Sequence, residues 1–167
     1  AYRQASTDRA DARKVDPENR LLWRMNRKRL EFEPMRDAML AVAGHLDPAV
    51  GGRPVDIEAD VSNGRRSIYA FIDRNNFSPL LRTFDFPSPD VHSSGRPLTF
   101  VPQQTLYVMN APFPQQMAGH VAARSSVRDA DNAEERVRAL YRIVLSREPS
   151  PDELRLAVAF LNTDEKT

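Results

Sequence analysis

FDFPSPDVHSSGRPLTFVPQQTLYVMN, residues 84–110, changes character three times, and the rest of the chain is arranged around it. It opens as an aromatic and acidic turn, continues as a loop with three prolines, and ends as a helical pattern with an apolar face. Proline fixes φ and removes an amide donor, so the middle part cannot extend a helix. We therefore predict a mainly α fold, a helical domain with a small β element and a proline-rich central loop.

Length and composition place the chain among globular proteins of one domain. Its 167 residues suffice for one core, and 41% hydrophobic and 28% charged residues are ordinary values. The net charge of +1 indicates no nucleic-acid partner, and no apolar run is long enough to span a membrane. Cysteine is absent, which excludes thiol catalysis, cysteine-type zinc sites and covalent c-type haem attachment within this chain.

The chain begins without a methionine or a signal peptide, and we interpret it as a segment cut from a longer protein. We expect residues 1–16 to form a loosely held N-terminal arm, residues 17–162 one mainly helical domain, and residues 163–167 a C-terminal tail. The triplet DPE at 16–18 is a helix-start signal, because it combines a cap residue, a first-position proline and an acid.

A basic cluster follows, made of Arg24, Arg27, Lys28 and Arg29. One interpretation is that the cluster binds phosphate or an acidic polymer. The other is a solvated helix face whose charge is answered by Glu31, Glu33 and Asp37, and the charge pattern favours this second interpretation.

The next patterns predict a buried helix and then a strand. The buried stripe of the helix consists of Met35, Met39, Val42 and Leu46, with Leu40 and Ala43 alongside. Gly44, or the Asp47-Pro48 step, should end this helix. Residues 66–72 alternate in apolar side chains and form the predicted strand, with residues 84–86 or 97–100 as its partner.

Proline marks the helices that come later in the chain. The pair Ser78-Pro79 caps a short helix, and Pro102 opens the central helix. The inward-facing residues of the central helix should be Leu106, Val108 and Met109. The segment APFP at 111–114 must break or kink this helix before residues 115–124 resume it.

A helical hairpin is predicted at the end of the chain, with helices at about 131–145 and 151–162. Capping boxes at 131–134 and 150–153 mark the two helix starts. The side chains expected to be buried between the helices are Tyr141, Leu145, Leu154 and Val158. A DNA-reading helix-turn-helix is rejected, because the second helix has Arg155 as its one basic residue.

No known catalytic constellation is legible in the sequence. The histidines at positions 45, 92 and 120 have no metal-ligand spacing, and only His92 lies in the central loop, where it is a candidate. Asp85 and Asp90 flank the proline loop, and such carboxylates either act as a pair or cap turns. Arg66 and Arg74 flank the predicted strand and can hold these aspartates with two parallel hydrogen bonds.

The candidate ligand-binding residues are Arg66, Asp85, Asp90, His92, Arg96 and Thr99. Among them we predict one network in which Asp85, Arg96 and Thr99 fix the loop onto the central helix. Arg66 is the competing partner for Asp85. No metal site and no catalytic residue is predicted.

Several segments taken together resemble one family. They are residues 16–26 and 29–31, residues 66–69, the pattern FDxPxPD at 84–90, the pattern RxxTxxPxQxLxxxN at 96–110, and the pattern RxPSxDEL at 147–154. In their order and spacing, which cover nearly the whole chain, these segments resemble the C-terminal domain of unknown function of planctomycete-type cytochrome-c-like multidomain proteins.

This resemblance implies a longer, exported protein with an extracytoplasmic or periplasmic-like location. Such proteins have a signal sequence, a cytochrome-c-like haem module and another uncharacterised domain upstream. Haem is expected only in such an upstream domain, because this chain has no CxxCH motif. The partners implied are the upstream domains of the same polypeptide and a glycan, since a polysaccharide-related role is a common suggestion for the family.

Two functions of different classes remain open, and the sequence leaves undecided whether the chain is an enzyme. The first is a non-enzymatic interaction or ligand-binding module of an exported, haem-linked multidomain protein. The alternative is a glycan-acting hydrolase or lyase domain, in which Asp85, Asp90 or His92 acts together with arginines at 66 and 96. An enzyme requires these groups to converge in one open cleft, whereas a binding module requires an aromatic platform or a wide apolar patch.

Overall fold

The computed structural model describes residues 3–164, and the chain divides after Leu30 into two units. Each unit is described by itself. The predicted C-terminal tail lies outside the described residues from position 165 onward, as do the first two residues of the predicted N-terminal arm.

The first unit contains one short helix, α1 (Ala10–Val15), in its described part. The helix start predicted at 16–18 is not formed. Asn19 and Leu22 have φ angles of 57° and 55°, a left-handed conformation that takes the chain out of any helix. The carboxylate of Asp16 instead accepts hydrogen bonds from the backbone amides of Arg20 and Leu21 and closes a turn.

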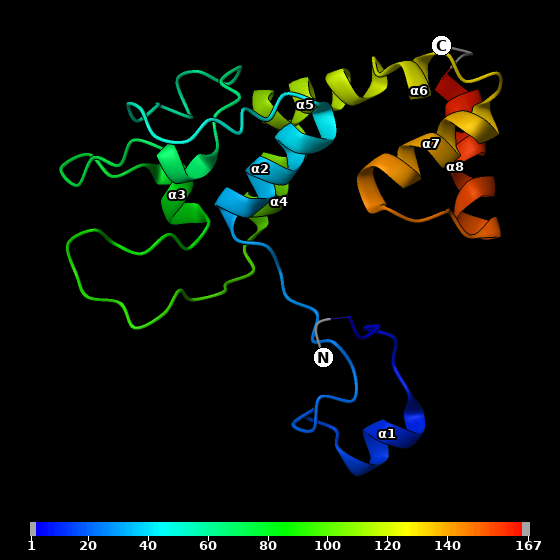
Figure 1. The fold of residues 1–167 in the computed structure, drawn as a ribbon, viewed down its shortest axis with the longest axis horizontal. Coiled ribbons are helices and arrows are strands. Elements are labelled where there is room, and N and C mark those ends of the chain that lie inside the picture. Colours follow the sequence, from blue (N-terminus) through cyan, green and yellow to red (C-terminus); the bar gives the residue numbers. More distant parts are fainter. Residues whose placement is uncertain (1–2, 165–167) are drawn as a thin grey trace. The chain divides into compact units, whose positions relative to one another are not determined.

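Helix α2 (Phe32–Ala43) lies at the centre of the second unit, between α4 and α5 and the loops that precede α3 (Figure 1). It ends at Gly44 as predicted, because Gly44 takes a left-handed φ of 78°. Its buried residues are Phe32, Arg36, Leu40 and Ala43, which recur at helical spacing. Leu40 and Ala43, which were predicted alongside the stripe, are thus buried, whereas Met35, Met39 and Val42 of the stripe itself are half-buried.

Two apolar clusters meet along α2. The first consists of Leu40, Ala43, Phe113, Met117 and Val121, and the second of Phe32, Ile57, Leu81 and Phe84. Along α2, Arg36 lies between Phe32, which belongs to the second cluster, and Leu40, which belongs to the first. Its guanidinium carbon is 5.0 Å from the ring centre of Phe113. A single helix thus supplies both halves of the core.

The segment between α2 and α3 forms no strand, so the strand predicted at 66–72 is wrong. Residues Ser67–Tyr69 form a 3-10 turn, η1, and among the described residues only isolated bridges pair Asp47 with Arg65 and Val55 with Ala70. The physical reason is Arg36, whose Nη1 donates to the carbonyl of Arg65 at 2.9 Å. The chain curls around this buried guanidinium and is not extended along a partner strand.

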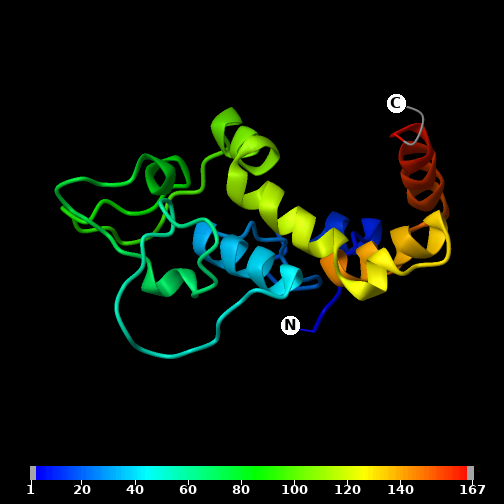
Figure 2. The ribbon, with the colours of Figure 1, turned by 90° about the horizontal axis from the view of Figure 1, so that it is seen from above.

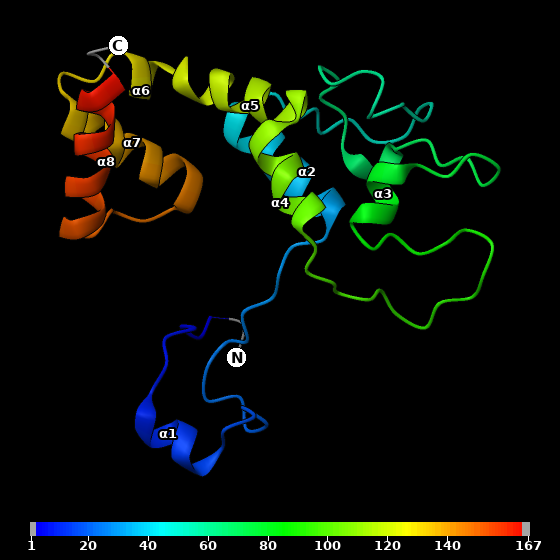
Figure 3. The ribbon, with the colours of Figure 1, turned by 180° about the vertical axis from the view of Figure 1, so that it is seen from behind.

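Two helices flank the stretch from which the sequence analysis began. Helix α3 (Pro79–Thr83) is capped as predicted, since Ser78 Oγ accepts a hydrogen bond from the amide of Leu81 at 3.0 Å. Residues 87–101 then run without helix or strand to α4, as Figure 3 shows.

Helix α4 (Pro102–Asn110) is followed at once by α5 (Pro112–Ala122), because the proline breaks the helix where the sequence predicted. The predicted inward face of α4 is wrong, since Leu106 and Met109 are exposed. Gln104 is buried instead, and its Nε2 donates to the carbonyl of Thr83 at 2.8 Å.

The last helices are α6 (Ser125–Arg128), α7 (Ala133–Leu145) and α8 (Pro151–Asp164). Both helix starts of the hairpin were predicted from caps. The box at 150–153 forms as predicted, whereas α7 is capped by Asn132, one residue later than the predicted box at 131–134. Asn132 Oδ1 accepts from the amide of Glu135 at 2.9 Å, while the Ser150 amide donates to Glu153 at 2.8 Å. Helices α7 and α8 contact each other and lie side by side in Figures 1 and 3, while Figure 2 shows them from above.

The burial predicted between α7 and α8 is only partial. Leu145 is 50% exposed, and Tyr141, Leu154 and Val158 are half-buried. The buried residue of α7 is Val137. The described residues confirm a mainly helical fold, and none of their helices has the length and apolar character needed to cross a membrane.

Candidate functional site

A groove of about 800 Å³ runs along the outer face of α2. One wall is the face of α2 that bears Pro34, Ala38 and Ala41, and the other wall is the segment 66–72. The remaining lining residues are Glu31, Glu33, Asp37, Leu46, Leu81, Phe86 and Arg96. The helix that builds the core with its inner face therefore forms a groove with its outer face.

The floor of the groove is apolar and unfilled. Ala38 and Ala41 are small and exposed, so the surface of α2 is low at this point. Ile68 on the opposite wall is 71% exposed, although isoleucine is among the residues most often buried. An exposed apolar surface bordered by polar groups is typical of a site that binds another molecule.

One end of the groove is closed by a fork of hydrogen bonds. Arg96 donates from Nη1 and Nη2 to the two carboxylate oxygens of Glu33, at 2.7 and 2.8 Å. Its Nη1 also lies 3.1 Å from a carboxylate oxygen of Glu31. The guanidinium carbon stands 4.9 Å from the ring centre of Phe86, so a cation covers the aromatic ring.

The pKa values at this fork follow from the pairing. Burial would raise the pKa of Glu33, but the hydrogen bonds from Arg96 and from the backbone, with the charge of Arg96, outweigh it. The pKa of Glu33 therefore lies below its ordinary value of 4.5. The hydrogen bond to Glu33 raises the pKa of Arg96. Both groups are charged at neutral pH, and Glu33 has no proton to donate as a general acid.

The groove holds a third carboxylate, that of Asp37. Asp37 Oδ1 accepts a hydrogen bond from the backbone amide of Ser67 at 2.7 Å, which joins α2 to the η1 turn. Its other oxygen lies 4.0 Å from Nε of Arg66. Three carboxylates and two guanidinium groups thus line the groove, which leaves it with one surplus negative charge.

Two of the six candidate residues named from the sequence, Arg66 and Arg96, line this groove. Asp85 lies outside it, and its carboxylate accepts from the amide of Thr99 at 2.8 Å and from the Thr99 hydroxyl at 2.7 Å. The predicted network is therefore half correct. Asp85 and Thr99 fix the loop, but Arg96 forms its hydrogen bonds with Glu33.

Asp90 and His92 also lie outside the residues that line the groove. Asp90 accepts from Nη2 of Arg74 at 2.8 Å and from Nε at 3.2 Å, which is the arginine partner expected from the sequence. His92 is exposed in the same loop. Asp85 and Asp90 are therefore held by different partners, Asp85 by Thr99 and Asp90 by Arg74.

The sequence analysis missed the two acids that organise the groove, Glu33 and Asp37. It treated them as partners of the basic cluster. Their spacing of four residues places both on one face of α2, next to the exposed Ala38 and Ala41. The detectable signal was this spacing of two acids beside small residues on one helix face.

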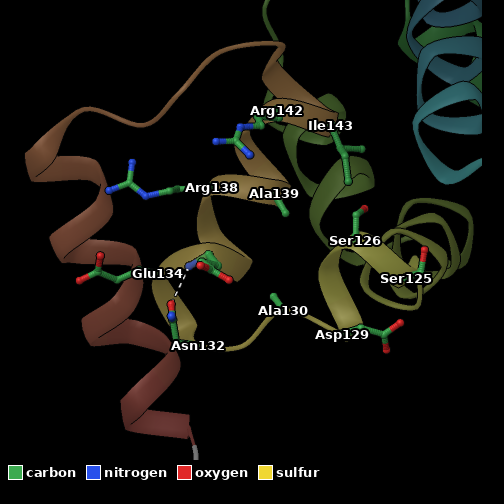
Figure 4. A pocket seen from close by; sticks show the side chains of 11 residues that line it. Ser125, Ser126, Asp129, Ala130, Asn132, Glu134, Arg138, Ala139, Arg142 and Ile143 are labelled. Carbon is green, nitrogen blue, oxygen red and sulfur yellow. Dashed lines mark hydrogen bonds between the residues drawn. The ribbon is translucent and has the colours of Figure 1, made fainter.

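A second hollow, of about 540 Å³, lies between α6 and α7 (Figure 4). Ser125, Ser126 and Asp129 come from the α6 side, and Glu134 and Arg138 from α7. Its lining is mixed, with Ala130, Ala139 and Ile143 among polar residues. Its basic groups are already paired, because Arg142 bonds to Glu148 and Arg138 lies 3.9 Å from the same carboxylate. Its three acids, Asp129, Glu134 and Glu135, outnumber its two arginines by one, as in the groove on α2, but the hollow lacks the apolar floor of the groove.

The remaining group of titratable residues is a histidine pair. The rings of His45 and His120 have their centres 3.9 Å apart, at the ends of α2 and α5. Within residues 3–164, no group of three or more His, Cys, Asp or Glu side chains is placed to hold a metal ion.

Comparison with known proteins gives one family. The family model described as PSD1, a protein of unknown function (DUF1553), matches residues 1–161. Comparisons with curated proteins and with solved structures find no match.

Proposed function

We propose that this chain, which belongs to the PSD1 family of proteins of unknown function (DUF1553), is a non-enzymatic interaction module whose groove on α2 binds a segment of a partner protein. The observation that carries the proposal is the groove itself. It has an apolar floor of small residues, and its rim is made of charges that are already paired. A preformed rim lowers the entropic cost of binding, because its side chains are ordered before the partner arrives.

The composition of the groove defines the partner's chemistry. Apolar side chains fit against Ala38, Ala41 and Ile68, and burying them supplies most of the binding free energy. Glu31 and Glu33 share one arginine, so the fork accepts a further cation. The partner segment is therefore one that combines apolar residues with a lysine or arginine.

A glycan fits this surface less well. Sugar rings are recognised by stacking on open aromatic faces. Phe86 is the aromatic residue of the groove, and the guanidinium of Arg96 lies over its ring. The hydrolase or lyase alternative further requires Asp85, Asp90 or His92 to act beside Arg66 and Arg96, yet only the two arginines line the groove.

The resemblance seen in the sequence supplies the biological setting of the proposal. The module serves an exported, planctomycete-type protein, in an extracytoplasmic location, whose haem lies in an upstream domain. An upstream domain of the same polypeptide is then the source of the partner segment. The chain itself should bind no haem, and titration with haem should give no saturable shift of the Soret band. A stoichiometric shift would contradict this part of the proposal.

Selection of displayed random peptides on the full chain tests the groove. Enriched peptides should contain apolar residues and a lysine or arginine, and should lose binding to Ala41→Trp, whose indole fills the floor. Ala159→Trp is the matched control, because Ala159 is an exposed helical alanine on α8 away from the groove. Both variants should keep the melting temperature of the parent chain.

Two results would overturn the proposal. Peptides that bind Ala41→Trp as tightly as the parent would place the site elsewhere. Turnover of a polysaccharide that survives Ala41→Trp but is abolished by Asp85→Asn would establish the enzymatic alternative, provided that Asp85→Asn keeps its fold by circular dichroism.

A further inference from the structure

Residues 16–26 of the first unit form a closely hydrogen-bonded turn, which belongs to neither the core nor the groove of the second unit. The buried carboxylate of Asp16 accepts from the amides of Arg20 at 3.0 Å and Leu21 at 2.7 Å. The indole Nε1 of Trp23 donates to the carbonyl of Asp16 at 2.8 Å. These three bonds hold the tip of the turn in one shape.

A buried asparagine ties the other end of the turn. Asn19 Oδ1 accepts from the amide of Arg24 at 3.2 Å, and its Nδ2 donates to the carbonyl of Arg24 at 2.8 Å. The same Nδ2 donates to Oδ1 of Asn26 at 2.7 Å. With its donors and acceptor satisfied inside the turn, Asn19 acts as a scaffold and the turn is rigid before any ligand binds.

This scaffold presents two leucines outward. Leu21 is 78% exposed and Leu22 is 49% exposed, so the tip of the turn is apolar. Leu22 also has a φ of 55°, a left-handed conformation that a leucine rarely adopts. Strained backbone of this kind persists where the surrounding bonds enforce it, and it is found most often at functional sites.

The two leucines lie in the basic part of the chain. Residues 1–30 contain nine lysines and arginines against four aspartates and glutamates, a net charge of +5. The remaining residues have fifteen basic against nineteen acidic groups, a net charge of −4. The overall charge of +1 conceals this separation. Residues 20 and 28 are at most about 29 Å apart even in extended chain, so one surface can meet the whole cluster.

Three basic side chains of this turn, those of Arg20, Arg27 and Lys28, form no ion pair within the described residues of the first unit. Glu31 and Glu33 form ion pairs with Arg96. Within residues 3–30, Asp16 bonds to backbone amides, and no carboxylate pairs with the side chains of Arg20, Arg27 or Lys28. The interpretation of the cluster as a helix face is wrong, because residues 24–29 are not helical.

We propose that residues 20–29, which we name the basic knuckle, dock onto an anionic lipid surface. Leu21 and Leu22 insert at the boundary between headgroups and acyl chains, while Arg27 and Lys28 bind lipid phosphates and carboxylates. A soluble polyanion would be held by the cations alone and would leave the leucines in water. The outward leucines on a rigid turn therefore select a surface that has an apolar interior.

Sedimentation of the full chain with lipid vesicles tests the docking. The chain should bind vesicles of phosphatidylcholine mixed with phosphatidylserine, bind poorly to phosphatidylcholine alone, and dissociate as salt is raised. Trp23 is the only tryptophan of the chain and adjoins Leu22. Its fluorescence should therefore be quenched by vesicles that contain brominated lipid.

Two sets of variants separate the roles of the leucines and of the charges. The double variant Leu21→Ser with Leu22→Ser should weaken vesicle binding by about tenfold or more, which corresponds to losing the burial of one leucine side chain. Its binding to heparin should be unchanged. Arg27→Gln with Lys28→Gln should weaken binding to both. Leu156→Ser and Arg53→Gln, each an exposed residue of the second unit, are the matched controls and should bind vesicles like the parent.

The proposal is overturned if the parent chain does not sediment with anionic vesicles. It is also overturned if the leucine variant binds vesicles and heparin as the parent does, because the knuckle would then be a site for soluble polyanions. Ala41→Trp, which fills the groove on α2, should leave vesicle binding unchanged, so that failure of either proposal is distinguishable from failure of the other.

Discussion

Helix α2 and the terminal hairpin of α7 and α8 both carry apolar stripes, yet the fold buries the first far more completely. Leu40 on α2 is fully buried, whereas Leu145 at the end of α7 is half exposed. The difference lies in the neighbours. Helix α2 is covered by α5 and by the segment around η1, while α7 and α8 contact mainly each other and α6. An apolar stripe therefore shows which residues share a face, and the rest of the fold decides whether the face is covered.

The largest effect that tests this comparison is the loss of the α2 core. Leu40→Ala should lower the free energy of unfolding by about 2–5 kcal/mol, because it removes buried methyl groups and leaves a cavity between α2 and α5. Chemical denaturation monitored by circular dichroism measures the change. An effect below that of Leu145→Ala would show that α2 is not the centre of the fold.

The next largest loss of stability is expected when the buried guanidinium of Arg36 is removed. Arg36→Met keeps most of the side-chain volume but leaves the carbonyls of Asn63 and Arg65 without their donors, at 2.7 and 2.9 Å in the parent. We expect a loss of roughly 1–3 kcal/mol, reduced by the desolvation cost that the charge no longer has. Burial lowers the pKa of Arg36, because removal from water disfavours the charged guanidinium. Unchanged stability would mean that residues 63–67 fold without this clamp.

The fork at the end of the groove gives a pH-dependent test. The pKa of Glu33 is lowered in the folded chain, so its contribution to stability is present above the ordinary value of 4.5 and is lost as the pH falls through the lower folded value. The melting temperature of Glu33→Gln should therefore lie below that of the parent at pH 7. The two should converge as the pH falls below 4.5. A difference that persists unchanged in acid would exclude an ionic origin.

Asp85 should have a smaller effect. Its carboxylate accepts two hydrogen bonds from Thr99, but these bonds are exposed to solvent. Asp85→Asn retains one acceptor oxygen and should cost about 1 kcal/mol. Thermal melting measures this change, and Thr99→Val should show a similar loss. The double variant should then lose less than the sum of the two single losses.

The smallest effect is expected in the hairpin. Leu145→Ala should lower stability by only about 0.5 kcal/mol, since half of the side chain is already in water. The same denaturation experiment that measures Leu40→Ala provides the comparison. A loss as large as that of Leu40→Ala would show that the hairpin face is covered in solution.

The ends of the helices could be predicted from the sequence where a capping residue or a proline nearby in the chain determines them. Ser78, Asn132 and Ser150 cap helices by bonds within a few residues, and Pro112 breaks one, so each boundary was predictable. Gly44 ended α2 as predicted for the same reason.

Features of the fold that depend on residues far apart in the chain could not be predicted from the sequence. The strand predicted at 66–72 became a 3-10 turn, because Arg36, about thirty residues earlier, binds the carbonyls of that segment. The face of α4 was predicted from its apolar residues, but Gln104 turns inward to reach the carbonyl of Thr83. The candidate site shows the same limit. Arg96 was recognised as a carboxylate partner, whereas its actual partner, Glu33, lies 63 residues away.

Hydrogen exchange of the full chain, followed amide by amide, tests the central role of α2 most directly. The amides of α2 should exchange slowest, at a rate set by global unfolding, because its inner face joins both apolar clusters. Those of α8 should exchange much faster, through local opening of the hairpin. Equal protection of α2 and α8, or faster exchange in α2, would contradict the account.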